Sequence, residues 1–490
     1  MWKKLTCVCL LTIFNICDAG YIAAVVEYSS LNEPTPNQTI ERNVVNYVNT
    51  IESLKQHNVQ IVVFPEYGLT DLVQDPENYS IIVPPLYTSD FSNASDALLR
   101  LSNAAREHGM YVVVNVLEQD HDNSTNNTLY YNTNVVFASN GTLVAKYRKI
   151  NLFQEPKLTP GNELVTFTTD FGKFGLMTCM DILYYNPSQT LLDGTNVTDV
   201  IYPAAWNSYL PFYLSLEVQV GYVLANKVNL LAANINEPSN GTGGSGIYLN
   251  DGTVLRRVIT DKAATSVIFG NVDTVINTSD FILSGFDLLS GGDITRERLA
   301  NYKRLRDFDH QAYTFRSLDL SKENISEPLC HDCFCCNFNI VALQNETNSS
   351  EVYKLLAYSG QTIFDSKSVQ IQLCGVVGCL TDDVSTCGEI PSSAYTTKFR
   401  QISINSTYMP RNPQAFFRPM SLKGDLLTID NATYSEVVDE DSLDEVILNF
   451  TVTTTSDNVV LFGLYGRDDS SIVSISALFI GVLFLIQNIF

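Results

Sequence analysis

The chain has 490 residues, of which 45% are hydrophobic and 17% charged, and its formal net charge is −23. Together with 25 Phe and 25 Tyr, this apolar content excludes intrinsic disorder as the main state and is enough for one or two full cores. The acidity argues against nucleic acid as a partner, because phosphate binding requires basic patches.

The first residues have the layout of a cleaved signal peptide. Lys3 and Lys4 precede an apolar run from Leu5 to Cys17, and small residues follow up to Ala19. We expect cleavage after Ala19, so that residues 1–19 are removed. The mature chain would keep 28 basic and 52 acidic side chains, a net charge of −24.

Asn-X-Ser/Thr sequons, the acceptors of N-linked glycans, occur at fifteen positions. Behind a signal peptide, this density predicts a heavily glycosylated extracellular protein. The candidate asparagines are Asn37, Asn78, Asn93, Asn123, Asn126, Asn140, Asn196, Asn240, Asn277, Asn324, Asn345, Asn348, Asn405, Asn431 and Asn449.

Between residues 20 and 300, short apolar runs alternate with segments of helical periodicity, which predicts an α/β layered domain. Apolar residues at three- and four-residue steps from Ile40 to Leu54 indicate the first helix. Asn140-Gly141 stands between two apolar runs and is a strong hairpin signal. We expect a second helix at 94–108 and strands at 21–26, 60–64, 110–117, 130–139, 143–147, 175–178, 199–202 and 229–233.

After about residue 300 the pattern changes to an alternation of period two, as in Val369, Ile371 and Leu373. Most of the eleven cysteines also occur there: Cys330, Cys333, Cys335, Cys336, Cys374, Cys379 and Cys387. In an oxidising compartment such a group predicts disulfides, and the odd number leaves one thiol without an intrachain partner. We expect residues 311–465 to form a smaller, mostly β domain with disulfides.

The run 330–336 has the alternative interpretation of a zinc-binding cluster, which the sequence leaves open. Three other cysteines, Cys7, Cys9 and Cys17, would leave with the signal peptide. Cys179 then stands alone in the first domain, either as a small buried hydrophobe or as a reactive thiol.

The end of the chain, from Ser471 to Phe490, contains no charged residue. An apolar terminal tail after small polar residues is typical of a lipid-anchor signal, whereas a transmembrane helix usually carries basic residues on its cytoplasmic side. We expect residues 466–490 to be a glycosylphosphatidylinositol (GPI) anchor signal, with the attachment residue within 466–471. A transmembrane span and a soluble product are the alternatives.

Three predicted strands of the first domain each lead to a reactive side chain: Glu66 after 61–65, Lys149 after 144–148, and Cys179 after 175–178. At the edge of a core these groups would be partly desolvated, which shifts pKa values. A thiol attacks an amide as its thiolate and needs a base, and the resulting oxyanion needs a positive donor. Each side chain alone would also suit a structural role, as a buried thiol, a strand-end cap or a solvated charge.

Three segments resemble, in order, the three motifs of the nitrilase superfamily: Phe64-Pro65-Glu66-Tyr67-Gly68-Leu69, Tyr147-Arg148-Lys149-Ile150-Asn151-Leu152-Phe153 and Thr178-Cys179-Met180-Asp181-Ile182-Leu183. Segments 202–206, 228–235 and 244–248, the cysteine-rich domain and the anchor signal resemble its vanin and biotinidase branch. The resemblance implies an α/β fold, a nitrilase-type α-β-β-α sandwich at 20–300, followed by the smaller β domain.

The resemblance implies that Glu66 is the general base, Lys149 the oxyanion donor and Cys179 the nucleophile. It also indicates the backbone N–H of Met180 as a second oxyanion contact and Glu155 as a second carboxylate near the lysine. No cofactor and no metal are implied.

Other candidate features are weaker. Trp206 either lines the acyl pocket or belongs to the core. Tyr131-Asn132 resembles a structural motif of the family, and we assign it no chemistry. No Gly-X-Ser-X-Gly segment is present, so we do not expect a serine triad.

The implied function is that of a secreted, surface-anchored amidohydrolase of the vanin type, which cleaves pantetheine to pantothenate and cysteamine through an acyl-thioester. A biotinidase-like amidase and a catalytically silent glycoprotein with an adhesion or signalling role are the alternatives. The expected partners are a small-molecule amide and, through the covalent anchor, the outer face of the cell membrane. Whether the protein is a monomer or a homodimer is left open.

Overall fold

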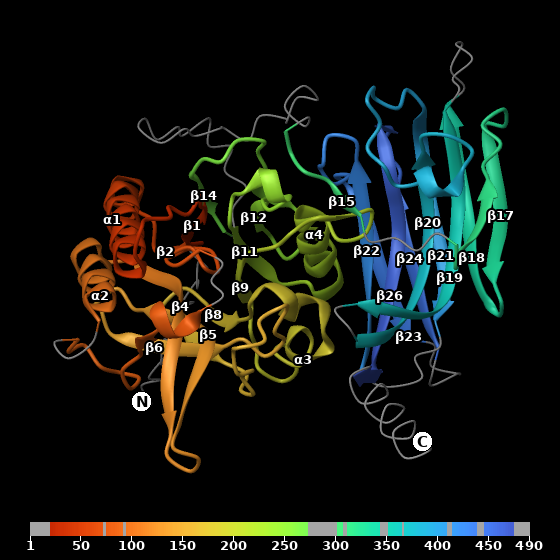
Figure 1. Ribbon diagram of the computed structural model, residues 1–490. Helices are drawn as coiled ribbons and strands as arrows, with labels where there is room; N and C mark the ends of the chain where they lie inside the picture. The colour runs from red at the N-terminus through yellow and green to blue at the C-terminus, as the bar shows by residue number, and fades with distance from the viewer. Residues whose placement is uncertain are drawn as a thin grey trace, which may run out of the picture.

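The computed structural model describes residues 20–71, 75–91, 95–272, 301–306, 311–343, 351–364, 367–408, 414–438 and 445–474. The expected signal peptide, the terminal segment 475–490 and four sequons (Asn93, Asn277, Asn345 and Asn348) lie outside these residues. Figure 1 shows two bodies side by side. We call them the α/β domain, residues 20–272, and the β domain, residues 311–474.

The α/β domain contains two β-sheets that pack face to face (Figure 1). The first has the order β14-β1-β2-β4-β5-β6, and β3 also pairs with β4. Its strands are β1 (Ile22–Glu27), β2 (Ile61–Val63), β3 (Ile81–Ile82), β4 (Tyr111–Asp122), β5 (Asn127–Phe137), β6 (Leu143–Arg148) and β14 (Ser266–Asn271). The second has the order β13-β12-β11-β9-β8-β7. Its strands are β7 (Thr166–Thr168), β8 (Lys173–Leu176), β9 (Asp199–Ala204), β11 (Asn229–Asn234), β12 (Ser245–Tyr248) and β13 (Val254–Val258).

Strand β1 shows why its sequence is continuously apolar. Ala23 and Val25 face the core between the two sheets, whereas Ala24 and Val26 face the core under the outer helices. Since successive side chains of a strand point to opposite faces, a strand buried on both sides cannot alternate with polar residues.

Helices cover the outer faces of both sheets. Helices α1 (Pro36–Leu54) and α2 (Asp96–His108) pack on the first sheet, and α4 (Ser215–Asn226) packs on the second. Short helical turns are η1 (Lys55–His57), η2 (Pro76–Asn78), η3 (Cys179–Leu183), α3 (Tyr185–Ser188) and η4 (Pro238–Asn240). The predicted α-β-β-α sandwich is thus confirmed.

Two caps define where the outer helices begin. The side chain of Thr35 accepts a hydrogen bond from the backbone N–H of Gln38, and that of Ser95 accepts one from Leu98. A cap of this kind satisfies an N–H group that the first helical turn leaves without an acceptor.

The β domain is a sandwich of two antiparallel sheets (Figure 1). One has the order β16-β19-β20-β26-β22, from β16 (Thr314–Ser317), β19 (Val352–Phe364), β20 (Lys367–Cys379), β22 (Ala415–Lys423) and β26 (Val459–Ser474). The other has the order β17-β18-β21-β24-β23, from β17 (Asn324–His331), β18 (Phe334–Leu343), β21 (Lys398–Tyr408), β23 (Ala432–Val438) and β24 (Val446–Val452), with β25 (Ser456–Asp457) beside β21. A short turn, η5 (Val384–Thr386), completes it. The predicted, mostly β second domain is confirmed, although β26 continues past residue 465, where we expected the domain to end.

Three disulfides link the β domain: Cys330–Cys335, Cys336–Cys374 and Cys379–Cys387. The prediction of disulfides is confirmed, and the zinc alternative is wrong because Cys330, Cys335 and Cys336 are bonded to other cysteines. Cys333 is the exposed thiol left over by the odd number. Over the described ranges, no group of three or more His, Cys, Asp or Glu side chains is placed to hold a metal ion.

The two domains share a buried interface. Helix α4 packs between the second sheet and β22, and β10 (Tyr209–Leu210) pairs with β15 (Leu305–Arg306), just before the β domain. Arg418 of β22 is 1% exposed and donates hydrogen bonds to the carbonyl oxygen of Ile182 and to Ser188 Oγ. Within the described part of the chain, the helices are too short or too polar to span a bilayer.

Candidate active site

The three reactive side chains predicted from the sequence lie around one cavity. Glu66 follows β2, Lys149 follows β6 directly, and Cys179 follows β8. Their exposed fractions are 1%, 2% and 7%, and all three line a cavity of about 200 Å³. Strands from both sheets therefore bring together residues that are far apart in the chain.

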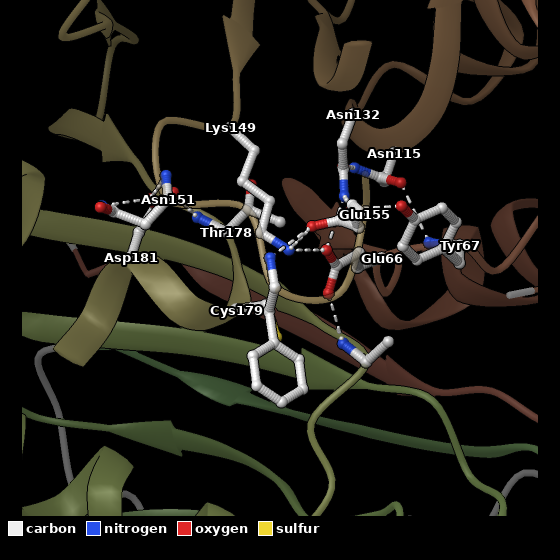
Figure 2. Close-up of polar contacts among 12 residues, drawn as sticks. Glu66, Tyr67, Asn115, Asn132, Lys149, Asn151, Glu155, Thr178, Cys179 and Asp181 are labelled. Carbon is white, nitrogen blue, oxygen red and sulfur yellow. Dashed lines mark hydrogen bonds and ion pairs between the residues drawn. The ribbon is translucent and has the colours of Figure 1, made fainter. Parts of the chain in front are cut away.

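Lys149 is held between two carboxylates. Its Nζ atom lies 2.8 Å from Glu66 Oε1 and 2.7 Å from Glu155 Oε2 (Figure 2). Burial alone would lower the pKa of Lys149, but the negative charges of Glu155 and Glu66 outweigh it and hold that pKa well above its ordinary value. The ammonium is thus positive at neutral pH and is fixed beside the thiol-bearing turn.

Both oxygens of Glu66 have defined donors. Oε1 accepts from Asn132 Nδ2 at 2.7 Å as well as from Lys149, and Oε2 accepts from the backbone N–H of Ala205 at 2.7 Å. Such contacts fix the carboxylate in one orientation. A fixed carboxylate can take and return a proton without reorganising its surroundings.

Glu155 belongs to the same cluster, as the resemblance indicated. It accepts hydrogen bonds from the hydroxyl of Tyr67, from Asn132 Nδ2 at 2.8 Å and from the backbone N–H of Phe153 at 3.0 Å. Burial acts to raise the pKa of Glu155, but the neighbouring Lys149 ammonium and these donors bring that pKa below its ordinary value. The residue is therefore ionised and balances part of the charge of Lys149.

Asn132 was predicted from the sequence only as part of a structural motif without chemistry, and the contact of its side chain with the site carboxylates was not predicted. Its Nδ2 atom bridges Glu66 and Glu155, and its Oδ1 atom accepts from Asn115 Nδ2 at 2.6 Å. Asn115 Nδ2 also donates to Asn134 Oδ1 at 2.9 Å. A signal was available, because Asn132 and Asn134 put two amides on one face of a strand whose following residues, Val135, Val136 and Phe137, are apolar.

Cys179 has an unusual backbone. Its φ of +46° places a non-glycine residue in the left-handed region, at the first position of η3. The turn is held by Asp181, whose carboxylate accepts from the backbone N–H groups of Thr178 at 2.9 Å and Asn151 at 2.8 Å. Tyr202 OH donates to the carbonyl oxygen of Cys179 at 2.8 Å. These contacts stabilise the sharp turn that presents the thiol to the cavity.

The thiol of Cys179 is neutral in this environment. Burial raises its pKa well above the ordinary value, and the negative charge of Glu66 adds to this effect. The positive charge of Lys149 opposes both. A nearby carboxylate is thus available to take the thiol proton when a substrate arrives.

Aromatic side chains form a large part of the rest of the cavity wall. Trp206, 5% exposed, lines the cavity and donates from Nε1 to the carbonyl oxygen of Tyr213 at 2.9 Å, so it contributes to both the pocket and the core. Met180 also lines the cavity, and its N–H belongs to the first turn of η3. Phe153 of the α/β domain and Phe364 of the β domain complete this wall. An apolar wall with a few fixed polar groups is typical of a small-molecule site.

Comparison with known proteins identifies the family. Residues 22–274 match the carbon-nitrogen hydrolase family. The chain belongs to this family. Residues 302–472 match the vanin C-terminal domain, so the predicted superfamily and its vanin branch are confirmed. The chain is therefore a hydrolase that acts on amide carbon-nitrogen bonds other than peptide bonds.

Some relatives align with this chain over most of its length, and one aligns over about half of it. Vanin-like protein 3 of Drosophila melanogaster is 30% identical, over 82% of this chain and 80% of its own. Pantetheinase of Homo sapiens is 28% identical, over 80% of each chain. Biotinidase of Mus musculus is 36% identical over 46% of this chain and 49% of its own. Among solved structures, Nit3 of Saccharomyces cerevisiae aligns with a TM-score of 0.43 and 21% identity, over 52% of this chain and 90% of its own.

Proposed function

We propose that the protein is a pantetheine hydrolase that uses Cys179 as nucleophile, Glu66 as general base and Lys149 as oxyanion donor. The observation that carries this proposal is the shared cavity: a buried ammonium, fixed 2.8 Å from a buried carboxylate, lines the same wall as a lone thiol. The three groups have complementary charges and can act on one amide.

In the first half of the reaction, the thiol proton of Cys179 passes to Glu66 and the sulfur attacks the amide carbon. The carbonyl oxygen becomes an oxyanion, which the ammonium of Lys149 and the backbone N–H of Met180 stabilise. The N–H of Met180 is suited to this role because the first turn of a helix leaves such donors without intrahelical acceptors. Glu66 then gives the proton to the leaving amine, the carbon-nitrogen bond breaks, and an acyl-thioester remains.

In the second half, Glu66 accepts a proton from a water molecule, and the hydroxide oxygen attacks the thioester carbon. The thiolate leaves, regains its proton from Glu66, and the carboxylic acid is released. Two steps help because a thioester is hydrolysed more easily than an amide. Glu155 and Asn132 have a positioning role here, because they hold Lys149 and Glu66.

The choice of pantetheine rests on the relatives. Proteins named pantetheinase, from Bos taurus and Homo sapiens, align with both domains of this chain. The higher identity of 36% to the mouse biotinidase, over a shorter stretch, supports biotinyl amides as the second candidate substrate.

The test is turnover by the purified protein of pantetheine and of a biotinyl amide, with cysteamine or free biotin as the readout. We expect hydrolysis of pantetheine, and we expect Cys179→Ala to abolish it and Lys149→Met to lower it by about 10²- to 10³-fold. Mass spectrometry of the acid-quenched enzyme should detect a pantothenoyl adduct on the Cys179 peptide. Equal inactivity of wild type and Cys179→Ala on both substrates would favour the silent glycoprotein.

We also propose that the protein is secreted, glycosylated and held at the outer cell surface by a GPI anchor. Nine described sequons are exposed: Asn37, Asn78, Asn123, Asn126, Asn140, Asn196, Asn240, Asn324 and Asn431. Asn405 and Asn449 are partly buried and hydrogen-bonded to each other at 2.6 Å, so we do not expect both to carry glycans.

The contacts of β26 limit where the anchor can be attached. Arg467 is buried and donates to Asp469 at 2.7 Å, and Asp469 accepts from the backbone N–H of Tyr185 at 2.6 Å. Attachment after these residues, at Ser470 or Ser471, preserves both contacts. Treatment of cells with phosphatidylinositol-specific phospholipase should release the protein. A known GPI-anchored protein on the same cells is the control. If the phospholipase releases that control protein and leaves this protein on the cells, the proposal is contradicted.

A further inference from the structure

We propose that the β domain takes part in substrate selection, because Phe364 forms the wall of the active-site cavity that contacts the distal, apolar end of the acyl group. This inference rests on the proposed function, since it assumes an amide with an extended acyl group. It assigns to the second domain a role in specificity and makes Phe364 a specificity-determining residue.

Phe364 lies at the active-site cavity. It is the last residue of β19 and lines the same cavity as Cys179, although nearly two hundred residues separate the two in the chain. Its ring stacks on Phe153 at a centroid distance of 6.4 Å and an angle of 25°, and it contacts Tyr213 at 5.2 Å. Phe364 is only partly buried, so part of the ring is free to meet a ligand.

Phe364 lies near the charged cluster but is not part of it. The backbone N–H of Phe153 donates to Glu155, which in turn accepts from Lys149. Phe364 therefore lies one aromatic ring away from the charged cluster, and it bonds to none of the groups that would act on the amide. A residue in this position contacts the part of a substrate that is remote from the reacting carbon.

A second cavity, of about 350 Å³, lies on the other side of this wall and shares Tyr213 and Phe364 with the first. It is bounded mainly by the β domain, with Tyr313, Tyr358 and Leu373 among its lining residues. Tyr213 and Phe364 thus face both spaces. The size of the side chain at position 364 thus sets how far a ligand can extend toward the β domain.

The chemistry of the wall indicates the class of ligand. Aromatic rings without a charge favour an apolar group, and burial of each CH₂ contributes roughly 0.8 kcal/mol. At the end of the acyl chain that is remote from the scissile amide, the pantoyl group carries two methyls, which are its apolar part, between two hydroxyl-bearing carbons. The biotinyl group carries its ring system at the corresponding end. The acetamide group that iodoacetamide transfers to a thiol has two carbons and carries no such distal group.

The experiment compares a long acyl substrate with a short probe of the same thiol. Wild type, Phe364→Ala and Phe364→Leu are assayed on pantetheine, or on the biotinyl amide if wild type prefers it. Alkylation of Cys179 by iodoacetamide is followed in parallel by mass spectrometry of the Cys179 peptide. Val437→Ala is the matched control, because Val437 of β23 is an apolar residue of the same domain, is 53% exposed and lines neither cavity.

We expect Phe364→Ala to lower kcat/KM for the long acyl amide by at least about tenfold, mainly through KM, because the lost contact is made in ground state and transition state alike. Phe364→Leu should lower kcat/KM by less than Phe364→Ala does, because Leu keeps part of the apolar contact. Alkylation of Cys179 should change by less than about twofold, and Val437→Ala should affect neither reaction.

Two results would overturn the inference. One is an unchanged kcat/KM in Phe364→Ala, and the other is a parallel loss of turnover and Cys179 alkylation, which would indicate a purely structural role. A wild type that hydrolyses neither amide but is alkylated at Cys179 would instead contradict the proposed function. The three outcomes are therefore distinguishable.

Discussion

Asn132 donates from its Nδ2 atom to Oε1 of Glu66 at 2.7 Å, and the same atom lies 2.8 Å from Glu155. One amide group thus sets the separation of two carboxylates that flank Lys149. Because Asn115 holds the other end of this amide at 2.6 Å, the nitrogen faces the carboxylates and not the strand behind it.

From this relationship we predict that Asn132→Ala lowers kcat by about 10- to 100-fold with little change in KM, since the substrate does not depend on Asn132 for binding. The acidic limb of the pH–rate profile should also move to higher pH, because Glu155, whose pKa Lys149 and its hydrogen-bond donors hold below the ordinary value, loses the donor Asn132. Steady-state kinetics across pH 4–8 provide the measurement. Asn127→Ala, an exposed change on the same strand, is the control. An unchanged profile together with a lower melting temperature would make Asn132 structural only.

The second prediction concerns the thiol. Burial and the charge of Glu66 raise the pKa of Cys179, while Lys149 opposes them. Glu66→Gln removes one of the raising charges and leaves the ammonium in place, so the pKa of the thiol should fall. Alkylation of Cys179 at pH 8 should then be faster than in wild type, whereas amide hydrolysis should drop by at least about 10²-fold because the base is lost.

Peptide-resolved rates of iodoacetamide labelling between pH 7 and 10 measure this effect. Exposed Cys333 in the same molecule serves as an internal reference whose rate should not change. If Glu66→Gln instead slows the labelling of Cys179 over the whole pH range, the negative charge of Glu66 does not raise the pKa of this thiol, and the prediction is wrong.

The third prediction links Glu27 to the pH dependence of stability. Burial raises the pKa of Glu27 to about 8, although the N–H of Gly244, 2.8 Å from Oε2, favours the charged form. The folded state then binds this proton more tightly than the unfolded state. Protonated Glu27 therefore contributes fully to the free energy of unfolding below the pKa that it has in the unfolded chain. This contribution is lost as the pH rises toward 8, by up to roughly 1.4 kcal/mol per pH unit.

Glu27→Gln keeps the acceptor for Gly244 and removes the titration. The melting temperature of this variant should therefore fall less than that of wild type between pH 5 and pH 8.5. Glu33→Gln, at an exposed position, is the matched control. Its melting temperature should fall with pH as steeply as that of wild type. Parallel curves for Glu27→Gln and wild type would show that Glu27 is already ionised at pH 5.

The fourth prediction compares two disulfides. Cys336 of β18 and Cys374 of β20 join the two sheets of the β domain across 38 residues, whereas Cys330 and Cys335 are five residues apart. The entropy lost by the unfolded chain grows with loop length, so the Cys336→Ala/Cys374→Ala pair should lower stability by roughly 4 kcal/mol and the Cys330→Ala/Cys335→Ala pair by roughly 2 kcal/mol. Thermal unfolding of both variants tests this order, and the reverse order would contradict it.

The sequence predicted the parts of this protein whose signals are local. Strand and helix alternation, the outer helix from Ile40 to Leu54 and the cysteine-rich β domain were all visible, because each depends on neighbours in the chain. Helix α4 was not predicted. Residues 215–224 are buried on every side, and a helix without a polar face shows no periodicity.

The site was predictable only in part for a similar reason. Glu66, Lys149 and Cys179 stand in motifs that can be read along the chain, and Glu155 stands near one of them. The bridging role of Asn132 depends on side chains from three other segments, and Phe364 reaches the cavity only because the β domain packs beside it. Contacts of this kind are set by tertiary packing, which leaves no local pattern.

Helix α4 packs against both the second sheet and β22, so its burial depends on the presence of both domains. If the gene were cut after the α/β domain, the apolar surface of α4 would face water, and exposed surfaces of that kind promote aggregation. The reactive thiol would then be lost together with the sandwich that supports it. A shortened enzyme of this lineage would need new polar residues along α4, and the two domains are expected to melt in one transition.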